Sequence, residues 1–142
     1  MNPTTIQLNP YLNFSGQCEE AFGFYEKTFG GQIESMMTYE KMPAEYRVAD
    51  DWRKKILHAT LLVRNQVLMG ADAPPDRYVK PQGFSVTIGL TDEKEAERIF
   101  AALAEQGSVL MALQPTFWAS RFGMVTDRFG IPWMINCGKG AA

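Results

Sequence analysis

TFWASRFGMVTDRFGIPWMINCG (residues 116–138) is the stretch that decides the fold of this chain. Phe122, Met124 and Thr126 recur at every second position, which is the pattern of a half-buried strand. The segment DRFG at 127–130 predicts a tight turn, because its glycine tolerates the positive φ that hairpin turns require. Residues 131–137 are almost entirely apolar, so we expect a second strand that is buried on both faces. The stretch therefore predicts an aromatic-rich loop followed by a β-hairpin.

Two tryptophans bracket this hairpin. We expect Trp133 in the core, with its indole N–H bonded to one partner, since large rings are usually buried. Trp118 lies in the loop between Phe117 and Ala119, where a core position and a pocket wall are equally good interpretations.

The length and composition of the chain fit one soluble domain. The 142 residues are 46% hydrophobic and carry a net charge of -2, so neither nucleic acid nor an anionic membrane is an expected partner. No apolar run is long enough to cross a bilayer, and the N-terminal residues lack the pattern of a secretory signal. Cys18 and Cys137 form no CxxC pair. We therefore expect a reduced, cytoplasmic protein.

Hydrophobic periodicity divides the first half into five regular elements and one loop. We predict a strand, a helix, a strand, a loop and two further strands at residues 6–14, 17–29, 32–40, 41–55, 56–63 and 67–71. Gly30 and Gly31 end the helix. The loop at 41–55 is charged and aperiodic, so it either lies over a cavity or forms a solvated connection.

The second half repeats the order of the first. After a proline-rich linker, a strand at 84–90 precedes a helix that Asp92 caps, with Glu95 completing a capping box. Ala96, Ile99, Phe100, Leu103 and Ala104 form the apolar stripe of this helix. A strand at 109–113 and the hairpin described above follow. A shift of 76 residues places Gly31 on Gly107 and aligns the apolar positions of the two first strands. Such a repeat predicts two similar modules.

Three segments resemble a known family. They are PYLNFSGQCEEAFGFYEKTFGG at 10–31, ILHATLLV at 56–63 and TFWASRFGMVTDRFGIPWMIN at 116–136. They are similar to the PhnB-like branch of the vicinal oxygen chelate superfamily, which includes glyoxalase I, extradiol dioxygenases and the fosfomycin- and bleomycin-resistance proteins. The resemblance implies an α+β fold of two βαβββ modules, with curved mixed sheets around a cavity and helices outside. We expect one glyoxalase-like domain, 1–142, made of module one at 1–72, a linker at 73–83 and module two at 84–142.

The resemblance also locates the metal positions of the superfamily. Metal-using members offer a His or Gln on the first strand of each module and a Glu on the last. Here the first-strand positions fall on Asn9 and Ser85, and the last-strand positions on Met134 and near Met69 or Gly70. Amide, hydroxyl and thioether groups are poor ligands for a catalytic dication, which prefers imidazole or carboxylate. We therefore expect no metal. Some members of the branch are labelled ubiquinone methyltransferases, but no glycine-rich nucleotide or S-adenosylmethionine motif follows a predicted strand, so we expect no cofactor.

His58 is the only histidine and lies on the same strand face as Thr60. It is a candidate general base or ligand-binding donor, and the alternative is a core histidine bonded to a backbone carbonyl. Glu40 and Asp72 end their strands, where they either face the mouth of a cavity or are simply exposed.

Two further side chains have a chemical and a structural interpretation. Arg121 is a candidate anchor for an anionic ligand, although a surface salt bridge is the alternative. Cys18 lies in the first turn of a helix, where the dipole lowers a thiol pKa, but no histidine neighbours it in sequence.

Two functional hypotheses follow. The first is a metal-free binding protein of the resistance or sequestration type, which holds a small, partly aromatic molecule in a cavity between the modules. Its expected ligand-binding residues are Asn9, Tyr11, Asn13, Ser85, Thr87, Trp118, Arg121, Phe122 and Met134. The second is a glyoxalase-like lyase or isomerase that uses His58 with Asp72 or Glu40 and a weakly held divalent metal. We also expect a homodimer, because both strand faces are more apolar than one helix layer needs.

Overall fold

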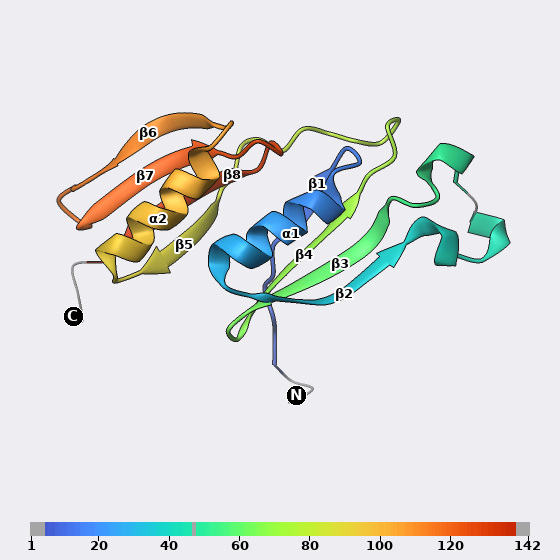
Figure 1. The fold of residues 1–142 in the computed structure, drawn as a ribbon, viewed down its shortest axis with the longest axis horizontal. Helices are drawn as coiled ribbons and strands as arrows, with labels where there is room; N and C mark the ends of the chain where they lie inside the picture. Colours follow the sequence, from blue (N-terminus) through green and yellow to red (C-terminus); the bar gives the residue numbers. More distant parts are fainter. Residues whose placement is uncertain (1–4, 47, 139–142) are drawn as a thin grey trace. The chain divides into compact units, whose positions relative to one another are not determined.

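Two units, each a four-stranded sheet with one helix on it, make up the computed structural model (Figure 1). The structure describes residues 5–46 and 48–138, and it divides into Met1–Tyr78 and Val79–Ala142. The dividing point lies within the predicted linker. Residues 1–4 and 139–142 of the two predicted modules, and Arg47 of the predicted loop, lie outside the described residues.

The first unit is a βαβββ module. Its strand order is β1-β4-β3-β2, with β1 parallel to β4 and the other neighbours antiparallel. Helix α1 lies across one face of this sheet (Figure 1). The elements are β1 (Tyr11–Phe14), α1 (Cys18–Phe29), β2 (Gln32–Thr38), three 3-10 turns η1 (Tyr39–Lys41), η2 (Ala44–Tyr46) and η3 (Asp50–Trp52), β3 (Ile56–Val63) and β4 (Gln66–Asp72).

The second unit has the same topology. Its strand order is β5-β8-β7-β6, again with one parallel pair, β5 with β8. Helix α2 covers one face (Figure 1). The elements are β5 (Val86–Leu90), α2 (Glu93–Ala104), β6 (Ser108–Gln114), β7 (Arg121–Thr126) and β8 (Pro132–Cys137). The α+β fold of two βαβββ modules is thus confirmed.

Helix α1 forms where the sequence predicts it and buries one face against its sheet. Ala21, Phe22 and Tyr25 are fully buried, whereas Phe24 is only half-buried. Burial of one such ring contributes about 1.5–3 kcal/mol. The helix ends at Gly30, which adopts the left-handed conformation with φ 72° and donates its N–H to the carbonyl of Glu26.

Helix α2 has the N-cap residue and the apolar stripe that the sequence predicts. Asp92 caps it, since its carboxylate accepts from the backbone N–H groups of Lys94 and Glu95 at 3.0 and 3.3 Å. The Glu95 carboxylate forms an ion pair with Arg98 at 2.6 Å. The predicted stripe is buried through Leu103.

Two strand predictions need correction. The first strand begins at Tyr11 rather than at Ile6, and Ile6 and Leu8 are 83% and 93% exposed. Tyr11 is the first residue that pairs with β4, opposite Met69, and in this register residues before Leu8 would run past the start of β4 at Gln66. The last strand, β8, is not buried on both faces. Trp133, Ile135 and Cys137 are buried against α2, and the alternate residues are half-buried.

The internal repeat is visible in the two helix-to-strand junctions. A Cβ atom at Gly31 would lie 2.4 Å from the carbonyl oxygen of Leu62, and one at Gly107 would lie 2.4 Å from that of Thr126. Each glycine lets the chain leaving a helix pass close to the third strand of its module. The predicted alignment of Gly31 with Gly107 therefore has a shared steric cause.

One buried aspartate organises each unit. The Asp72 carboxylate accepts from the backbone N–H groups of Gly16, Cys18 and Ile56, each at 2.9 Å. In the second unit, Asp127 accepts from the N–H groups of Phe129 and Ile131 at 2.8 and 3.0 Å and from the Trp133 indole at 2.8 Å. Trp133 is 2% exposed, so its predicted core position with one hydrogen-bond partner is confirmed.

Candidate functional site

Each sheet has one face against its helix and one face turned away from it, which we call the open face. Strand register places alternate residues together on these faces. The open face of the first unit carries Tyr11, Asn13, Met37, His58, Thr60 and Met69. The open face of the second unit carries Thr87, Gly89, Met111, Phe122, Met124, Met134 and Asn136.

A chain of side-chain hydrogen bonds crosses the first open face. The Tyr11 hydroxyl lies 3.3 Å from His58 Nδ1, and His58 Nε2 lies 3.0 Å from the Thr60 hydroxyl. The Tyr11 and His58 rings are tilted against each other with centroids 5.7 Å apart. Burial, with smaller contributions from Cys18 and Tyr39, raises the Tyr11 pKa, so this side chain is a neutral phenol at physiological pH.

The hydrogen bonds to Tyr11 and Thr60 limit the chemistry that is open to His58. Both ring nitrogens have hydroxyl partners, so a substrate proton would have to displace one of them. The partners are side-chain hydroxyls rather than the backbone carbonyl of the core-histidine alternative. Thr60 and Met69 were not among the predicted binding residues. Thr60 could have been included, because the sequence already placed it on the same strand face as His58.

The superfamily metal positions can be located by register. Met69 pairs with Tyr11 across the parallel strands, and Met134 pairs with Thr87, whose hydroxyl lies 3.8 Å from the Met134 sulfur. Asn9 and Ser85 each lie two residues before these partners and outside the strands. A neutral phenol, an alcohol and two thioethers do not fit a catalytic dication. Within residues 5–46 and 48–138, no group of three His, Cys, Asp or Glu side chains is placed to hold a metal ion.

Two predicted chemical partners of His58 have other roles. Asp72 is 1% exposed, and both its carboxylate oxygens accept from backbone N–H groups, so it is a structural residue rather than a catalytic acid at a cavity mouth. Glu40 is exposed and forms an ion pair with Arg53 at 3.7 Å. Asn13 is exposed on the open face, opposite Ala71.

Cys18 is not an activated nucleophile. Its side chain is fully buried, and burial followed by the nearby Asp72 carboxylate raises the pKa of the thiol well above its usual range. The expected influence of the helix dipole is therefore outweighed by desolvation.

The aromatic loop of the second unit forms a cluster of rings. Trp118 is 48% exposed and meets Phe117 and Phe122 edge-on, with centroids 4.8 and 5.2 Å apart. A core position for Trp118 is thus wrong. Arg121 lies on the other side of the sheet, where it forms ion pairs with Glu93 at 3.4 Å and Glu97 at 3.7 Å on α2. This is the salt-bridge interpretation of that side chain.

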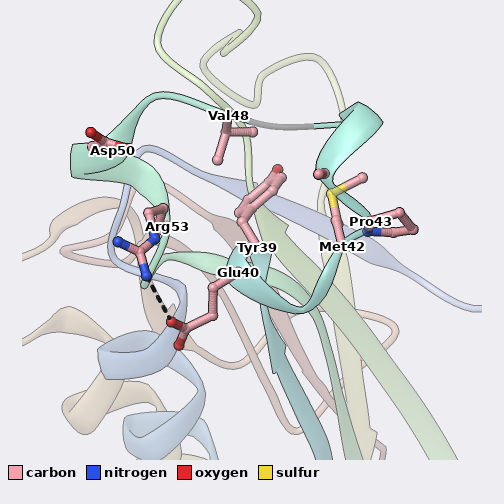
Figure 2. Close-up of a pocket in the computed structure, with 8 residues that line it drawn as sticks. Tyr39, Glu40, Met42, Pro43, Val48, Asp50 and Arg53 are labelled. Carbon is pink, nitrogen blue, oxygen red and sulfur yellow. Dashed lines mark ion pairs between the residues drawn. The ribbon is translucent and has the colours of Figure 1, made fainter.

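The long loop after β2 encloses a pocket of its own. Its volume is about 450 Å³, and its lining residues are Tyr39, Glu40, Met42, Pro43, Ala44, Val48, Asp50 and Arg53. Figure 2 shows Tyr39 and Val48 pointing toward each other inside the loop, with the Glu40–Arg53 ion pair at its base. The Tyr39 hydroxyl donates to the backbone carbonyl of Asp72 at 2.6 Å, which ties this pocket to the core. The sequence left open whether this loop lies over a cavity or forms a solvated connection, and it did not indicate that the loop itself lines a pocket.

Among the described residues, no helix is long and apolar enough to cross a membrane.

The sequence of this chain matches a known protein family. The family described as 3-demethylubiquinone-9 3-methyltransferase matches residues 6–136. Protein YjdN of Escherichia coli (strain K12) is 35% identical, over 94% of this chain and 97% of its own length.

Solved structures agree with this match. Protein PA1353 from Pseudomonas aeruginosa is 47% identical with a TM-score of 0.87, covering 94% of this chain and 98% of that one. A putative 3-demethylubiquinone-9 3-methyltransferase, PhnB protein, from Bacillus cereus is 25% identical with a TM-score of 0.79, covering 94% and 100%. The fosfomycin resistance protein FosX from Listeria monocytogenes shares the fold alone, with 9% identity and a TM-score of 0.62 over 96% and 95%.

Proposed function

Because the chain belongs to the family described as 3-demethylubiquinone-9 3-methyltransferase, the PhnB-like branch of the glyoxalase and bleomycin resistance superfamily, we propose that it is a metal-free small-molecule binding protein of the sequestration type. The fold itself does not decide between binding and catalysis, since function depends on the site. The proposal therefore rests on the residues of the open faces.

The Tyr11–His58–Thr60 chain is the observation that supports binding most directly. It holds three polar side chains in a fixed order on a sheet face that also carries Met37 and Met69. Ligand sites combine such apolar surface with a few oriented polar groups. With neutral His58, one hydroxyl donates to the ring and can still accept from a bound molecule, while the other accepts from the ring and can still donate.

The same residues favour binding over a glyoxalase-like lyase or isomerase. An enzyme of that kind needs a base with an accessible lone pair and an acidic or metal partner. Here His58 has hydroxyls on both nitrogens, and the Asp72 carboxylate is occupied by backbone N–H groups. We also do not take methyl transfer from the family's description, because no glycine-rich loop follows a strand in this sequence.

A thermal-shift screen of small aromatics, 2-oxoaldehyde adducts and phosphonates tests the proposal. A ligand at well above its Kd should raise Tm by mass action. Tyr11→Phe and Thr60→Val should each weaken the best hit about fivefold, because each removes one hydrogen bond worth about 1 kcal/mol. Tyr46→Phe is the matched control, since Tyr46 is an exposed tyrosine of the 39–53 loop. If no compound raises Tm, or if the two variants bind like the wild type, the proposal fails.

A separate measurement tests the proposal that the protein binds no metal. Elemental analysis of the purified protein should show no dication at one per chain, and added zinc, nickel or manganese should leave the affinity for the best hit unchanged. A stoichiometric metal that is lost in Asn9→Ala or Tyr11→Phe would contradict the argument from donor type.

We further propose a homodimer. Edge strand β6 exposes apolar side chains, with Val109 50% and Leu110 65% exposed. An exposed apolar edge strand can pair with the same strand of a second chain. Light scattering should give twice the mass of the chain, whereas a mass near 16.0 kDa would argue against it.

A further inference from the structure

A row of three methionines crosses the open face of the second unit. Met111 on β6 pairs with Met124 on β7, and Met124 pairs with Met134 on β8. Cross-strand partners have Cβ atoms about 4.5–5.5 Å apart, so the three methionine side chains start from neighbouring positions on this face. Thioethers are flexible and polarizable, and they make favourable contacts with aromatic rings.

Beside the methionine row, this face has an open position at Gly89 and a polar side chain at Asn136. Gly89 is the register partner of Asn136, and a Cβ atom added at Gly89 would meet nothing within 4 Å. The side-chain oxygen of Asn136 is buried and has no hydrogen-bond partner among the described residues. An unpaired buried acceptor costs about 1–3 kcal/mol, so a donor brought by a bound molecule would stabilise this oxygen.

Aromatic rings close the other side of the same face. Phe122 is the register partner of Asn136 on β7, and Trp118 meets the Phe122 ring edge-on. Trp118 is exposed although it is large and apolar. An open position, an acceptor and an aromatic ring thus follow one another across β5, β8 and β7, beside the methionine row.

We propose that this face binds a flat aromatic molecule that carries an N–H or O–H donor. The ring would lie over Gly89, against Phe122 and the thioethers of Met124 and Met134. Its donor would pair with the Asn136 carboxamide, which can turn toward the space over Gly89 because the χ2 angle of asparagine is broad. The inference rests on the proposed binding function and names the ligand class for one of the two faces.

The first unit lacks this combination. By register, Ala71 takes the place of Asn136, Asn13 the place of Gly89, and His58 the place of Phe122. Its face instead carries the hydrogen-bonded Tyr11–His58–Thr60 side chains, without an open floor beside an unpaired acceptor among the described residues. It therefore serves as an internal control for the assignment.

Methyl NMR of the full chain labelled with ¹³C at the methionine methyl groups tests the inference. Indole is the probe, and benzofuran, which has the same shape without a donor, is the matched compound. Indole should shift the methyl signals of Met124 and Met134 through its ring current, and leave those of Met37 and Met69 in place. Benzofuran should bind at the same place about fivefold more weakly, since it lacks one hydrogen bond.

Three variants sharpen the result. Gly89→Leu should abolish the shifts by filling the floor, whereas Gly23→Leu, at a helical glycine with equally open space, should respond like the wild type. Asn136→Ala should bind indole no better than benzofuran. The wild-type comparison of the two probes stands even where a variant fails to fold.

Several outcomes would overturn the inference. Shifts at Met37 and Met69 alone would leave small-molecule binding intact and refute this face as the aromatic site. Equal affinity for indole and benzofuran would refute the role of Asn136. Absence of any methyl shift up to the solubility of indole would refute the ligand class, while the proposed function is decided separately by the thermal-shift screen.

Discussion

The two units share a backbone plan but differ in the chemistry of their open faces. Equivalent register rows read Ser35, Thr60, Met69 and Tyr11 in the first unit, and Met111, Met124, Met134 and Thr87 in the second. The first row belongs to a polar, hydrogen-bonded face and the second to a thioether face. The loop between the second and third strands also differs, since it builds a pocket in the first unit and displays Trp118 in the second.

What stays the same in the two units holds the fold, and what differs is free to serve function. The buried faces keep a helix, a close-approach glycine and a buried aspartate that accepts from three N–H groups. Substitution there is constrained by packing and by buried hydrogen bonds. The open faces carry no such constraint, so they can differ. Four predictions test this division, beginning with the largest effect.

The buried aspartates should be equally important in both units. Asp72→Ala and Asp127→Ala each leave three N–H groups without their acceptor, all buried except that of Gly16, and each should lower the free energy of unfolding by about 4 kcal/mol. Urea denaturation measures the loss. The exposed Asp76→Ala is the control and should stay within about 0.5 kcal/mol of the wild type. A small effect at only one of the two sites would break the equivalence.

Substitution of the two glycines at the helix-to-strand junctions should have the next largest effect on stability. Gly31→Ala and Gly107→Ala each push a methyl group against a backbone oxygen at 2.4 Å, and each should cost about 2–3 kcal/mol by overpacking. Gly23→Ala, in open space on α1, should instead stabilise by about 0.8 kcal/mol through helix propensity. Denaturation curves of the three variants measure these differences. Equal stabilities would show that close packing is not the reason for a glycine at both junctions.

The free energy of unfolding should fall at alkaline pH because of one buried thiol in the first unit. Burial and Asp72 raise the pKa of Cys18 in the folded state, so the thiol stays protonated where the unfolded chain has already lost its proton. Stability should therefore be intact below about pH 8.5 and fall by about 1.4 kcal/mol for each pH unit above it. Cys18→Ala should reduce that slope by one proton. An unchanged slope between pH 8.5 and 10 would mean that other groups, such as Tyr11 and Tyr39, account for the loss.

The smallest expected difference lies at the helix starts. Asp92 caps α2 with its side chain, whereas Gln17 makes no side-chain cap for α1. Asp92→Ala should cost about 1 kcal/mol and Gln17→Ala close to nothing. Thermal denaturation of both variants is the measurement. A loss at Gln17→Ala as large as that at Asp92→Ala would show that the Gln17 side chain does stabilise the start of the first helix, and would contradict this prediction.

Much of the fold could be predicted because its signals are local. The hairpin at 116–138, both helices and strand β3 follow from periodicity, caps and turn glycines that span a few residues each. The site was less predictable. Tyr11 was expected on the cavity side and His58 was a candidate, but their contact joins residues 47 apart in sequence. The pocket-forming role of the 39–53 loop depends on short turns that no sequence period indicates.

The sequence by itself determined the order of elements, the duplication and the core position of Trp133, since each depends on patterns carried by neighbouring residues. The tertiary structure decided where strands stop, which face of β8 is half-exposed and what the carboxylates do. The first strand looks apolar from Ile6 onward, yet it pairs only from Tyr11, because the register of a parallel strand is set by its distant partner. Asp72 ends a strand in the sequence, but three N–H groups from two other segments make it a buried structural residue.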